Sequence, residues 1–193
     1  TDFEEDVLKS CIEKAYDKKF DSDEIAPIKK IGTSYFLELY HGPTLAFKDM
    51  ALSILPYLLK AAMKINNIPE EVVILTATSG DTGKAALEGF ANVDGIKIIV
   101  FFPENGVSQV QKLQMKTQEG DNTFVVGIHG NFDDAQNGVK EIFNDREFVR
   151  ILKENNYILS SANSINIGRL VPQIVYYFNS YITLLRNGEL NAG

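Results

Sequence analysis

The segment Val72-Val73-Ile74-Leu75-Thr76-Ala77-Thr78-Ser79-Gly80-Asp81-Thr82-Gly83-Lys84-Ala85 decides the fold of this chain. An apolar, β-branched run predicts a short strand over residues 72–76, and a helical pattern follows over residues 80–91. The glycine-rich turn between them aims several backbone N–H groups at one place, which is how proteins bind anions. A plain turn between a strand and a helix has the same pattern, so this segment indicates a fold before it indicates an activity.

The same alternation continues along the chain. Further strands are predicted at residues 96–102, 123–128 and 157–160. Helices are predicted at residues 107–118, 132–155 (with a break near Asn144) and 165–186. Short buried strands that alternate with helices predict a parallel sheet covered on both faces. We therefore expect an α/β fold: a three-layer α/β/α domain with a mainly parallel sheet of about four strands, preceded by an N-terminal helix.

The first part of the chain is more polar. An acidic helix is predicted over residues 2–19, a linker over 21–27, a short strand over 35–40, a loop over 41–44 and an apolar helix over 45–62. Pro56 lacks a backbone donor and is expected to kink or stop that last helix. We divide the chain into an N-terminal helix and linker, residues 1–34, and an α/β domain, residues 35–193.

Composition narrows the classes of function. The chain has 193 residues, of which 45% are hydrophobic and 23% charged, as in soluble globular proteins. No apolar run reaches the ~20 residues of a membrane span, and no secretory signal is recognisable. The net charge is −7 and no basic stripe is present, so neither a membrane nor nucleic acid is expected as a partner.

The reactive side chains that are scarce also give information. Cys11, the single cysteine, cannot form an internal disulfide, and it falls on an apolar helical stripe as a small buried residue. A reducing cytoplasm fits this best. His41 and His129 have no acidic or histidine neighbours at metal-ligand spacing, so no metal site is expected. No Ser-His-Asp arrangement is supported either.

A nucleotide-binding P-loop is a competing interpretation of the glycine-rich turn. The pattern G-x-x-x-x-G-K-[ST] fits Gly83 and Lys84, but Thr78 stands where it needs glycine. Ala85 stands where it needs the hydroxyl that binds magnesium. These two mismatches argue against a phosphate-hydrolysing enzyme. Within the turn, Gly80 and Gly83 would let a ligand approach the backbone, and Ser79 or Thr78 could cap the helix.

Lys48 is the most informative single residue. It ends the run Glu38-Leu39-Tyr40-His41-Gly42-Pro43-Thr44-Leu45-Ala46-Phe47-Lys48 at the start of a helical pattern. The helix dipole and the apolar residues 45–47 both disfavour a charged amine, and a neutral amine is what a Schiff base to an aldehyde requires. Asp49 acts in the opposite direction, so the sign of the net pKa shift stays open. A solvated surface lysine is the ordinary alternative.

Four blocks of sequence agree with one family. Two of them are residues 38–49 and 76–83. The third is Phe102-Pro103 with Ser108, Gln109 and Lys112-Leu113, and the fourth is residues 163–170 followed by 173–178. Together they resemble threonine synthase of the microbial branch, a pyridoxal-phosphate enzyme of fold type II. The likeness runs from about Phe36 to Phe178.

The resemblance implies a site and a substrate. Lys48 would hold pyridoxal 5'-phosphate as a Schiff base, with Phe47 and Asp81 beside the cofactor. The loop Ser79, Gly80, Asp81, Thr82 and Gly83 would bind the α-carboxylate of the substrate. Asn163, Ser164, Asn166 and Arg169 would bind the phosphate of O-phospho-L-homoserine, a small-molecule substrate. From the residues alone, Arg169 could instead form a surface ion pair, Asn163 and Ser164 could be a helix cap, and the role of Asp81 is open.

The implied reaction converts O-phospho-L-homoserine and water to L-threonine and phosphate, the last step of threonine biosynthesis, with Lys48 as the base at the α-carbon. A serine/threonine dehydratase-like lyase would keep Lys48 but lack the block at residues 163–169. A non-catalytic module derived from the family is the third hypothesis.

The family also has a cofactor-phosphate loop of the Ser-Gly-Asn-Phe-Gly type and a second half, and neither appears before Gly193. Because residue 1 is Thr instead of Met, we expect a processed or cut chain. We therefore expect a fragment that is a monomer or a weak homo-oligomer, binds the cofactor weakly and is inactive alone.

Overall fold

The computed structural model describes residues 2–164 and 166–191 of the chain. Its helices are α1 (Glu5–Ala15), α2 (Asp49–Ile65), α3 (Asp81–Phe90), α4 (Gln109–Lys116), α5 (Phe132–Asn144), α6 (Arg146–Glu154) and α7 (Ile167–Arg186). Its strands are β1 (Ile28–Ile31), β2 (Ser34–Leu37), β3 (Glu71–Ala77), β4 (Ile96–Pro103), β5 (Thr123–Ile128) and β6 (Tyr157–Ser161).

The main sheet has the strand order β5-β4-β3-β6, and every neighbouring pair is parallel. The four predicted strands are confirmed to within about one residue at each end. Strand β3 lies in the middle, between β4 and β6, and all of its residues after Glu71 are buried. This continuous burial is the reason that β3 has a run of apolar residues instead of an alternating pattern.

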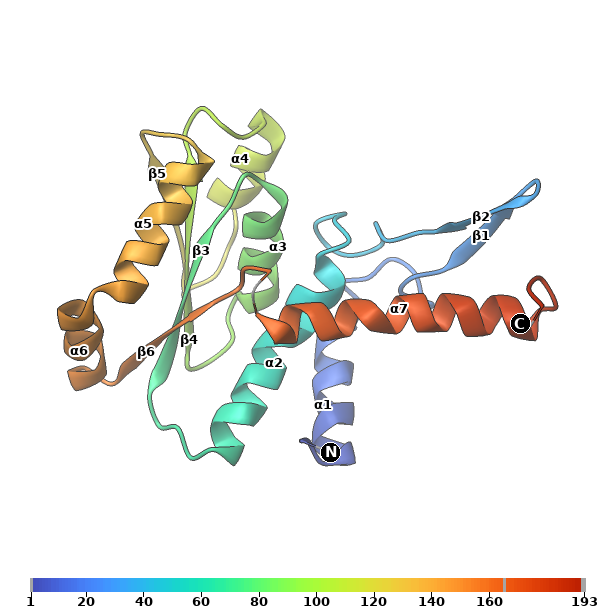
Figure 1. The fold of residues 1–193 in the computed structure, drawn as a ribbon, viewed down its shortest axis with the longest axis horizontal. Coiled ribbons are helices and arrows are strands. Elements are labelled where there is room, and N and C mark those ends of the chain that lie inside the picture. Colours follow the sequence, from blue (N-terminus) through green and yellow to red (C-terminus); the bar gives the residue numbers. More distant parts are fainter. Residues whose placement is uncertain (1, 165, 192–193) are drawn as a thin grey trace.

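Helices cover both faces of the sheet (Figure 1). On one face, α2 and α3 pack against the sheet around Leu52, Leu87 and Phe90, together with Met115 of α4. On the other face, Ala135 and Val139 of α5 are buried against β3. The three-layer α/β/α prediction is therefore confirmed.

The prediction that Pro56 kinks or stops its helix is wrong in its stronger form, because α2 continues from Asp49 to Ile65. Pro56 cannot donate to the carbonyl of Leu52, one turn earlier. A Cβ at Gly89 would collide with that carbonyl oxygen, so the absence of a side chain there lets α3 pack closely against this point of α2. All residues from Asp49 to Pro56 are buried, and this packing outweighs the lost hydrogen bond.

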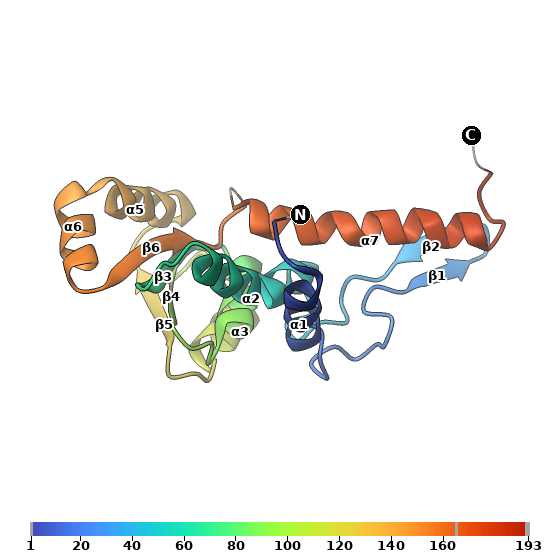
Figure 2. The same ribbon diagram turned by 90° about the horizontal axis from the view of Figure 1, so that it is seen from below.

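The strand predicted at residues 35–40 is present as β2, over Ser34–Leu37, whereas β1 and its pairing with β2 were not predicted. Strands β1 and β2 form an antiparallel hairpin that lies beside the far end of α7 (Figure 2). Lys30 of the hairpin forms an ion pair with Glu189, just after α7, at 2.8 Å. The division between residues 34 and 35 stays a prediction, although the hairpin pairs residues on both sides of it.

Three further features were predicted from the sequence: a break near Asn144, the burial of Cys11 and the lack of a membrane span. The predicted break near Asn144 is confirmed, because α5 ends there and the Asp145 side chain caps α6 by accepting from Phe148 N at 3.0 Å. Cys11 is buried as expected. Within the described residues, no helix has both the length and the apolarity that crossing a bilayer demands.

Candidate active site around Lys48

Two loops meet at the carboxyl edge of the sheet. Strands β3, β4 and β5 follow one another toward one side, and β6 then returns to the other side of β3. In open parallel sheets, ligands bind where the strand order reverses in this way. The residues predicted to bind substrate follow β3 and β6, and both groups therefore lie at this edge.

The loop after β3 is tied together by Thr78. Its buried hydroxyl oxygen accepts from Gly80 N at 3.0 Å and from Gly83 N at 2.9 Å. The N-cap of α3 is Gly80, so neither residue predicted as a cap stands at that position; Thr78, two residues earlier, accepts from Gly83 N, and Ser79 is exposed. Gly80 has a φ of +144°, a conformation that favours glycine.

These bonds leave other donors of the first helical turn available. The N–H groups of Asp81 and Thr82 are too near the start of α3 to bond within the helix. Within the described residues, neither donates to another part of the chain. The loop therefore presents donors at the positive end of a helix, which is a geometry suited to an anion.

Lys48 lies directly before α2 and points toward this loop. Its Nζ is 3.9 Å from Oδ2 of Asp81 and 4.3 Å from the centre of the Phe47 ring. Burial lowers the pKa of Lys48; Asp81 acts against this shift, while Arg169 and Lys84 add to it. The sign that the sequence left open is thus downward, in the direction of a neutral amine.

Asp49 follows Lys48 in the sequence, but its carboxylate is hydrogen-bonded to Thr44. Its buried carboxylate accepts from Thr44 N at 2.8 Å and from Thr44 Oγ1 at 2.5 Å. A side chain at Gly42 would collide with this carboxylate, so glycine is required there. Asp49 therefore fixes the loop that precedes Lys48, and it has only a small influence on the pKa of Lys48.

Asp81 is held by two residues that the sequence did not indicate as part of the site. Gln111 Nε2 donates to Oδ1 of Asp81 at 2.9 Å, and Lys84 Nζ lies 3.5 Å from the same oxygen. Lys84 also donates to the carbonyl of Thr44 at 3.0 Å. Burial pushes the pKa of Asp81 upward, but the Gln111 hydrogen bond and the two lysines outweigh it and leave the pKa below its ordinary value.

A sequence signal for Gln111 does exist. Ser108 and Gln111 have the spacing of a capping box, and the structure contains it: Ser108 caps α4 and Gln111 bonds back to Ser108 N. This pattern places Gln111 at the start of the helix after β4. Because β4 is the neighbour of β3, the residue comes close to the loop that carries Asp81.

The residues predicted to bind phosphate in the loop after β6 have different roles in the structure. Arg169 is buried, its Nη1 donates to Ala162 O at 3.2 Å, and its Nε is buried without a hydrogen-bond partner in the described residues. Asn166 has a structural role: it caps α7 by accepting from Gly168 N at 2.9 Å and donates to Ser161 O at 2.8 Å. The helix cap is therefore Asn166, and neither Asn163 nor Ser164 has that role.

Arg169 is also not the surface ion pair that was the alternative from the residues alone. Burial lowers the pKa of its guanidinium, and it forms no salt bridge within the described part of the chain. Its charge acts on Lys48 instead, where it disfavours protonation. Arg169 is therefore coupled electrostatically to Lys48, whereas no hydrogen bond between described residues links Asn163, Ser164 or Asn166 to Lys48 or Asp81.

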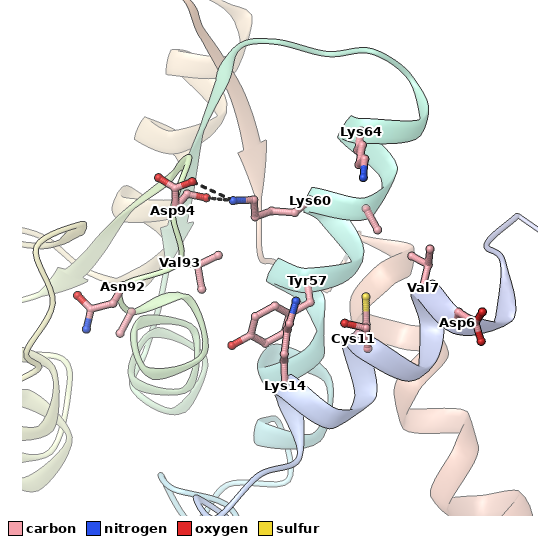
Figure 3. A pocket seen from close by; sticks show the side chains of 13 residues that line it. Asp6, Val7, Cys11, Lys14, Tyr57, Lys60, Lys64, Asn92, Val93 and Asp94 are labelled. Atoms are coloured by element: carbon pink, nitrogen blue, oxygen red, sulfur yellow. Dashed lines mark hydrogen bonds and ion pairs between the residues drawn. The ribbon is translucent and has the colours of Figure 1, made fainter.

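A large cavity lies elsewhere, between α1, α2 and the turn after α3 (Figure 3). Its volume is about 710 Å³, and Cys11, Tyr57 and Lys60 are among its lining residues. Lys60 donates to the backbone and the side chain of Asp94, at 2.6 and 3.2 Å. The cavity contains none of the predicted site residues, so it is separate from the candidate active site.

The expectation that His41 has no acidic neighbours is wrong. The sequence spacing indicated no acidic partner, but its ring lies between Asp21 Oδ1 at 2.6 Å and Glu38 Oε2 at 2.9 Å. The two carboxylates raise the pKa of His41. Across residues 2–164 and 166–191, no three side chains gather as a metal site.

Comparisons with known proteins identify the family. The model of the pyridoxal-phosphate dependent enzymes matches residues 21–176. The threonine synthase of Pseudomonas aeruginosa is 45% identical over 178 residues, which are 92% of this chain and 36% of that protein. Human threonine synthase-like 1 is 43% identical over 195 residues, which are 96% of this chain and 26% of that protein.

A solved structure agrees with these relatives. The threonine synthase from Brucella melitensis with bound pyridoxal phosphate is 40% identical, with a TM-score of 0.82 over 93% of this chain and 37% of that one. The chain thus spans between about a quarter and somewhat more than a third of the length of its relatives. Because the family model covers most of its residues, the chain belongs to the pyridoxal-phosphate-dependent enzymes.

Proposed function

We propose that the complete protein is a threonine synthase, which converts O-phospho-L-homoserine and water to L-threonine and phosphate. The observation that carries this proposal is the Lys48 amine: it is partly buried, its pKa is lowered, and it lies 3.9 Å from Asp81 at the carboxyl edge of the sheet. The relatives named as threonine synthases support the choice of reaction.

The residues around Lys48 fit pyridoxal phosphate. A neutral amine is the form that bonds to an aldehyde, and the Phe47 ring beside it offers an apolar surface for a flat cofactor. Lys48, Phe47 and Asp81 would hold the cofactor. When bound, it supplies an electron sink for the charge that develops at the substrate α-carbon.

The charge of the site suits an anionic substrate. Lys84 and Arg169 both act on the pKa of Lys48, and Asp81 and the loop-bound Asp49 oppose them. This positive excess occurs in a chain whose net charge is −7. A phosphate ester of an amino acid carries negative charge at both ends, and it would neutralise this excess.

Each end of the substrate has a proposed position. The carboxylate would bind the loop from Ser79 to Gly83, where the N–H groups of Asp81 and Thr82 are free to donate. The phosphate would bind Arg169, whose buried Nε lacks a partner within the described residues, together with Asn163 and Ser164. Asn166 would contribute through the loop that it shapes.

Lys48 would also act as the base that removes a proton from the substrate. Its Nζ in the neutral form can accept the proton of the substrate α-carbon, and a pKa below the ordinary value makes that form accessible nearer to neutral pH. Asp81, at 3.9 Å, can stabilise the charged amine that results. The proton would thus be held on Nζ of Lys48, and Asp81 would stabilise it there.

Turnover in the complete protein tests the proposal. Phosphate and threonine released from O-phospho-L-homoserine would be measured for the wild type, for Lys48→Ala and for Lys64→Ala, an exposed lysine at the other end of α2. We expect Lys48→Ala to abolish both products and Lys64→Ala to retain them.

The same assay also tests the two alternatives, a dehydratase-like lyase and a non-catalytic module. Deamination of threonine without turnover of O-phospho-L-homoserine would indicate a dehydratase-like lyase and overturn the proposal. No turnover of either compound by the complete protein would indicate a non-catalytic module. For the present residues alone we expect little or no threonine.

A further inference from the structure

Gln111 is oriented by two different partners. Its Oε1 accepts from Ser108 Oγ at 3.0 Å and from Ser108 N at 3.3 Å, so this end of the amide must be the oxygen. The other end is then the donor, and it lies 2.9 Å from Oδ1 of Asp81. One side chain thus links the start of α4 to the start of α3.

The loop is shaped to admit this amide. The side chain of Gln111 lies so close to Gly80 that any Cβ there would overlap it. The φ of +144° is the reason that Gly80 is glycine, and a Cβ there would also displace the Gln111 amide. The amide is packed against the loop and is not a freely moving surface group.

We propose that Gln111 is a positioning residue for the reaction at Lys48, because its amide holds Oδ1 of Asp81 and leaves Oδ2 facing the lysine amine. The inference rests on the proposed function for its consequence, but the geometry stands by itself. Oδ2 lies 3.9 Å from Lys48 Nζ, which is longer than a hydrogen bond. Asp81 is thus held close enough to stabilise a charged amine and too far to bond it tightly.

Charged groups from three helices act on this pair. Asp81 faces Lys48 before α2 and Lys84 on α3, and Lys48 also senses Arg169 on α7 and Asp49 on α2. Lys84 is 3.5 Å from the oxygen that Gln111 binds, so both hold the same end of the carboxylate. If Gln111 no longer held that oxygen, Asp81 would lose the hydrogen bond that lowers its pKa, and its carboxylate would no longer be fixed relative to Lys48.

Gln111→Glu separates positioning from capping. A glutamate at this position of a capping box still accepts from Ser108 N, so α4 should keep its start. It cannot donate to Asp81, and it adds a negative charge beside the pair. We expect the melting temperature to stay near that of the wild type, while the pKa of Asp81 and the pKa of Lys48 both rise.

Two readouts measure these shifts. Carbon-detected NMR of the Asp81 carboxyl group follows its titration in the chain without any cofactor. The rate at which added pyridoxal 5'-phosphate forms an imine with Lys48, measured against pH, follows the amine. For Gln111→Glu, we expect the midpoint of the Asp81 titration and the midpoint of the rate profile to move to higher pH.

Two further variants keep the test decisive. Gln111→Met preserves the length of the side chain without a donor and must also raise the pKa of Asp81. Ser108→Ala weakens the cap but leaves the donor of Gln111 near Asp81, so it should lower the melting temperature with a smaller effect on that pKa.

Unchanged Asp81 titrations in both Gln111 variants would overturn the inference. So would a Ser108→Ala shift as large as that of Gln111→Glu, because Gln111 would then act only through its helix. If Lys48 of the complete wild-type protein forms no imine, the proposed function fails, and the Asp81 titration still decides the role of Gln111.

Discussion

The loops after β3 and β6 lie at the same edge of the sheet, but they differ in whether their polar groups are hydrogen-bonded within the chain. In the β3 loop, the Thr78 hydroxyl accepts from two backbone N–H groups and Asp81 is held from α4. In the β6 loop, Asn166 completes the turn, whereas the buried Arg169 keeps an Nε without a partner in the described residues.

The difference distinguishes residues that build the site from residues that are available to a ligand. Thr78 and Asn166 have their hydrogen bonds used within the chain, so their loss should act mainly on stability. Lys48 and Arg169 are desolvated charges with few internal partners, and such groups are characteristic of functional sites. The following predictions test this division, from the largest expected effect to the smallest.

Thr78→Val should have the largest effect on stability. The change keeps the shape of the side chain but leaves two buried N–H groups without their acceptor, which should cost about 2–3 kcal/mol. Thr76→Val is the matched control, because its buried hydroxyl has no partner in the part of the chain described, and it should cost about zero or stabilise slightly. Urea unfolding measures both, and equal losses would contradict the account.

Asn166→Ala should destabilise the protein by about 1 kcal/mol, because α7 loses its N-cap. Asn163→Ala, in the same loop, should cost less than about 0.5 kcal/mol, since its side chain bonds none of the described residues. Thermal unfolding of the two variants provides the comparison. A larger loss for Asn163→Ala would mean that the cap has been assigned to the wrong asparagine.

Arg169→Met should raise the pKa of Lys48. The guanidinium is one of the charges that disfavour a protonated amine, so removing it favours protonation. NMR titration of the lysine side chains measures the shift, and Arg186→Met at the far end of α7 should leave it unchanged. A downward shift in Arg169→Met would show that the two groups are not coupled as the structure indicates.

The smallest effect is the pH dependence of stability. Because the folded pKa of Lys48 lies below its ordinary value of 10.5, the unfolded chain binds more protons between these two values. Lys48 therefore costs stability at lower pH, and this cost disappears as the pH rises through the folded pKa toward 10.5. Comparing Lys48→Met with Lys64→Met by urea unfolding across that range should show the rise reduced only in Lys48→Met.

Local patterns predicted much of the fold. Strands β3 to β6 and helices α3 to α7 lie near the predicted residues, because burial imposes its period on the sequence wherever an element is long. The position of Lys48 beside the loop after β3 followed from the resemblance to threonine synthase.

Long-range contacts account for what the sequence did not reveal. The hairpin β1–β2 depends on the end of α7, and the continuity of α2 at Pro56 depends on its packing against α3. Gln111 reaches Asp81 from α4, thirty residues further along the chain, whereas Lys84 is only three residues from Asp81 in the same helix. No local window contains Gln111 and Asp81 together, so this contact could not be predicted from a local pattern.

The most direct test of the central claim is the position of the imine. The chain would be mixed with pyridoxal 5'-phosphate, reduced with borohydride, digested and analysed by mass spectrometry. We expect the label on Lys48, because its burial and its cationic neighbours favour the neutral amine. A label mainly on Lys84 or on exposed lysines, with Lys48 unmodified, would contradict it.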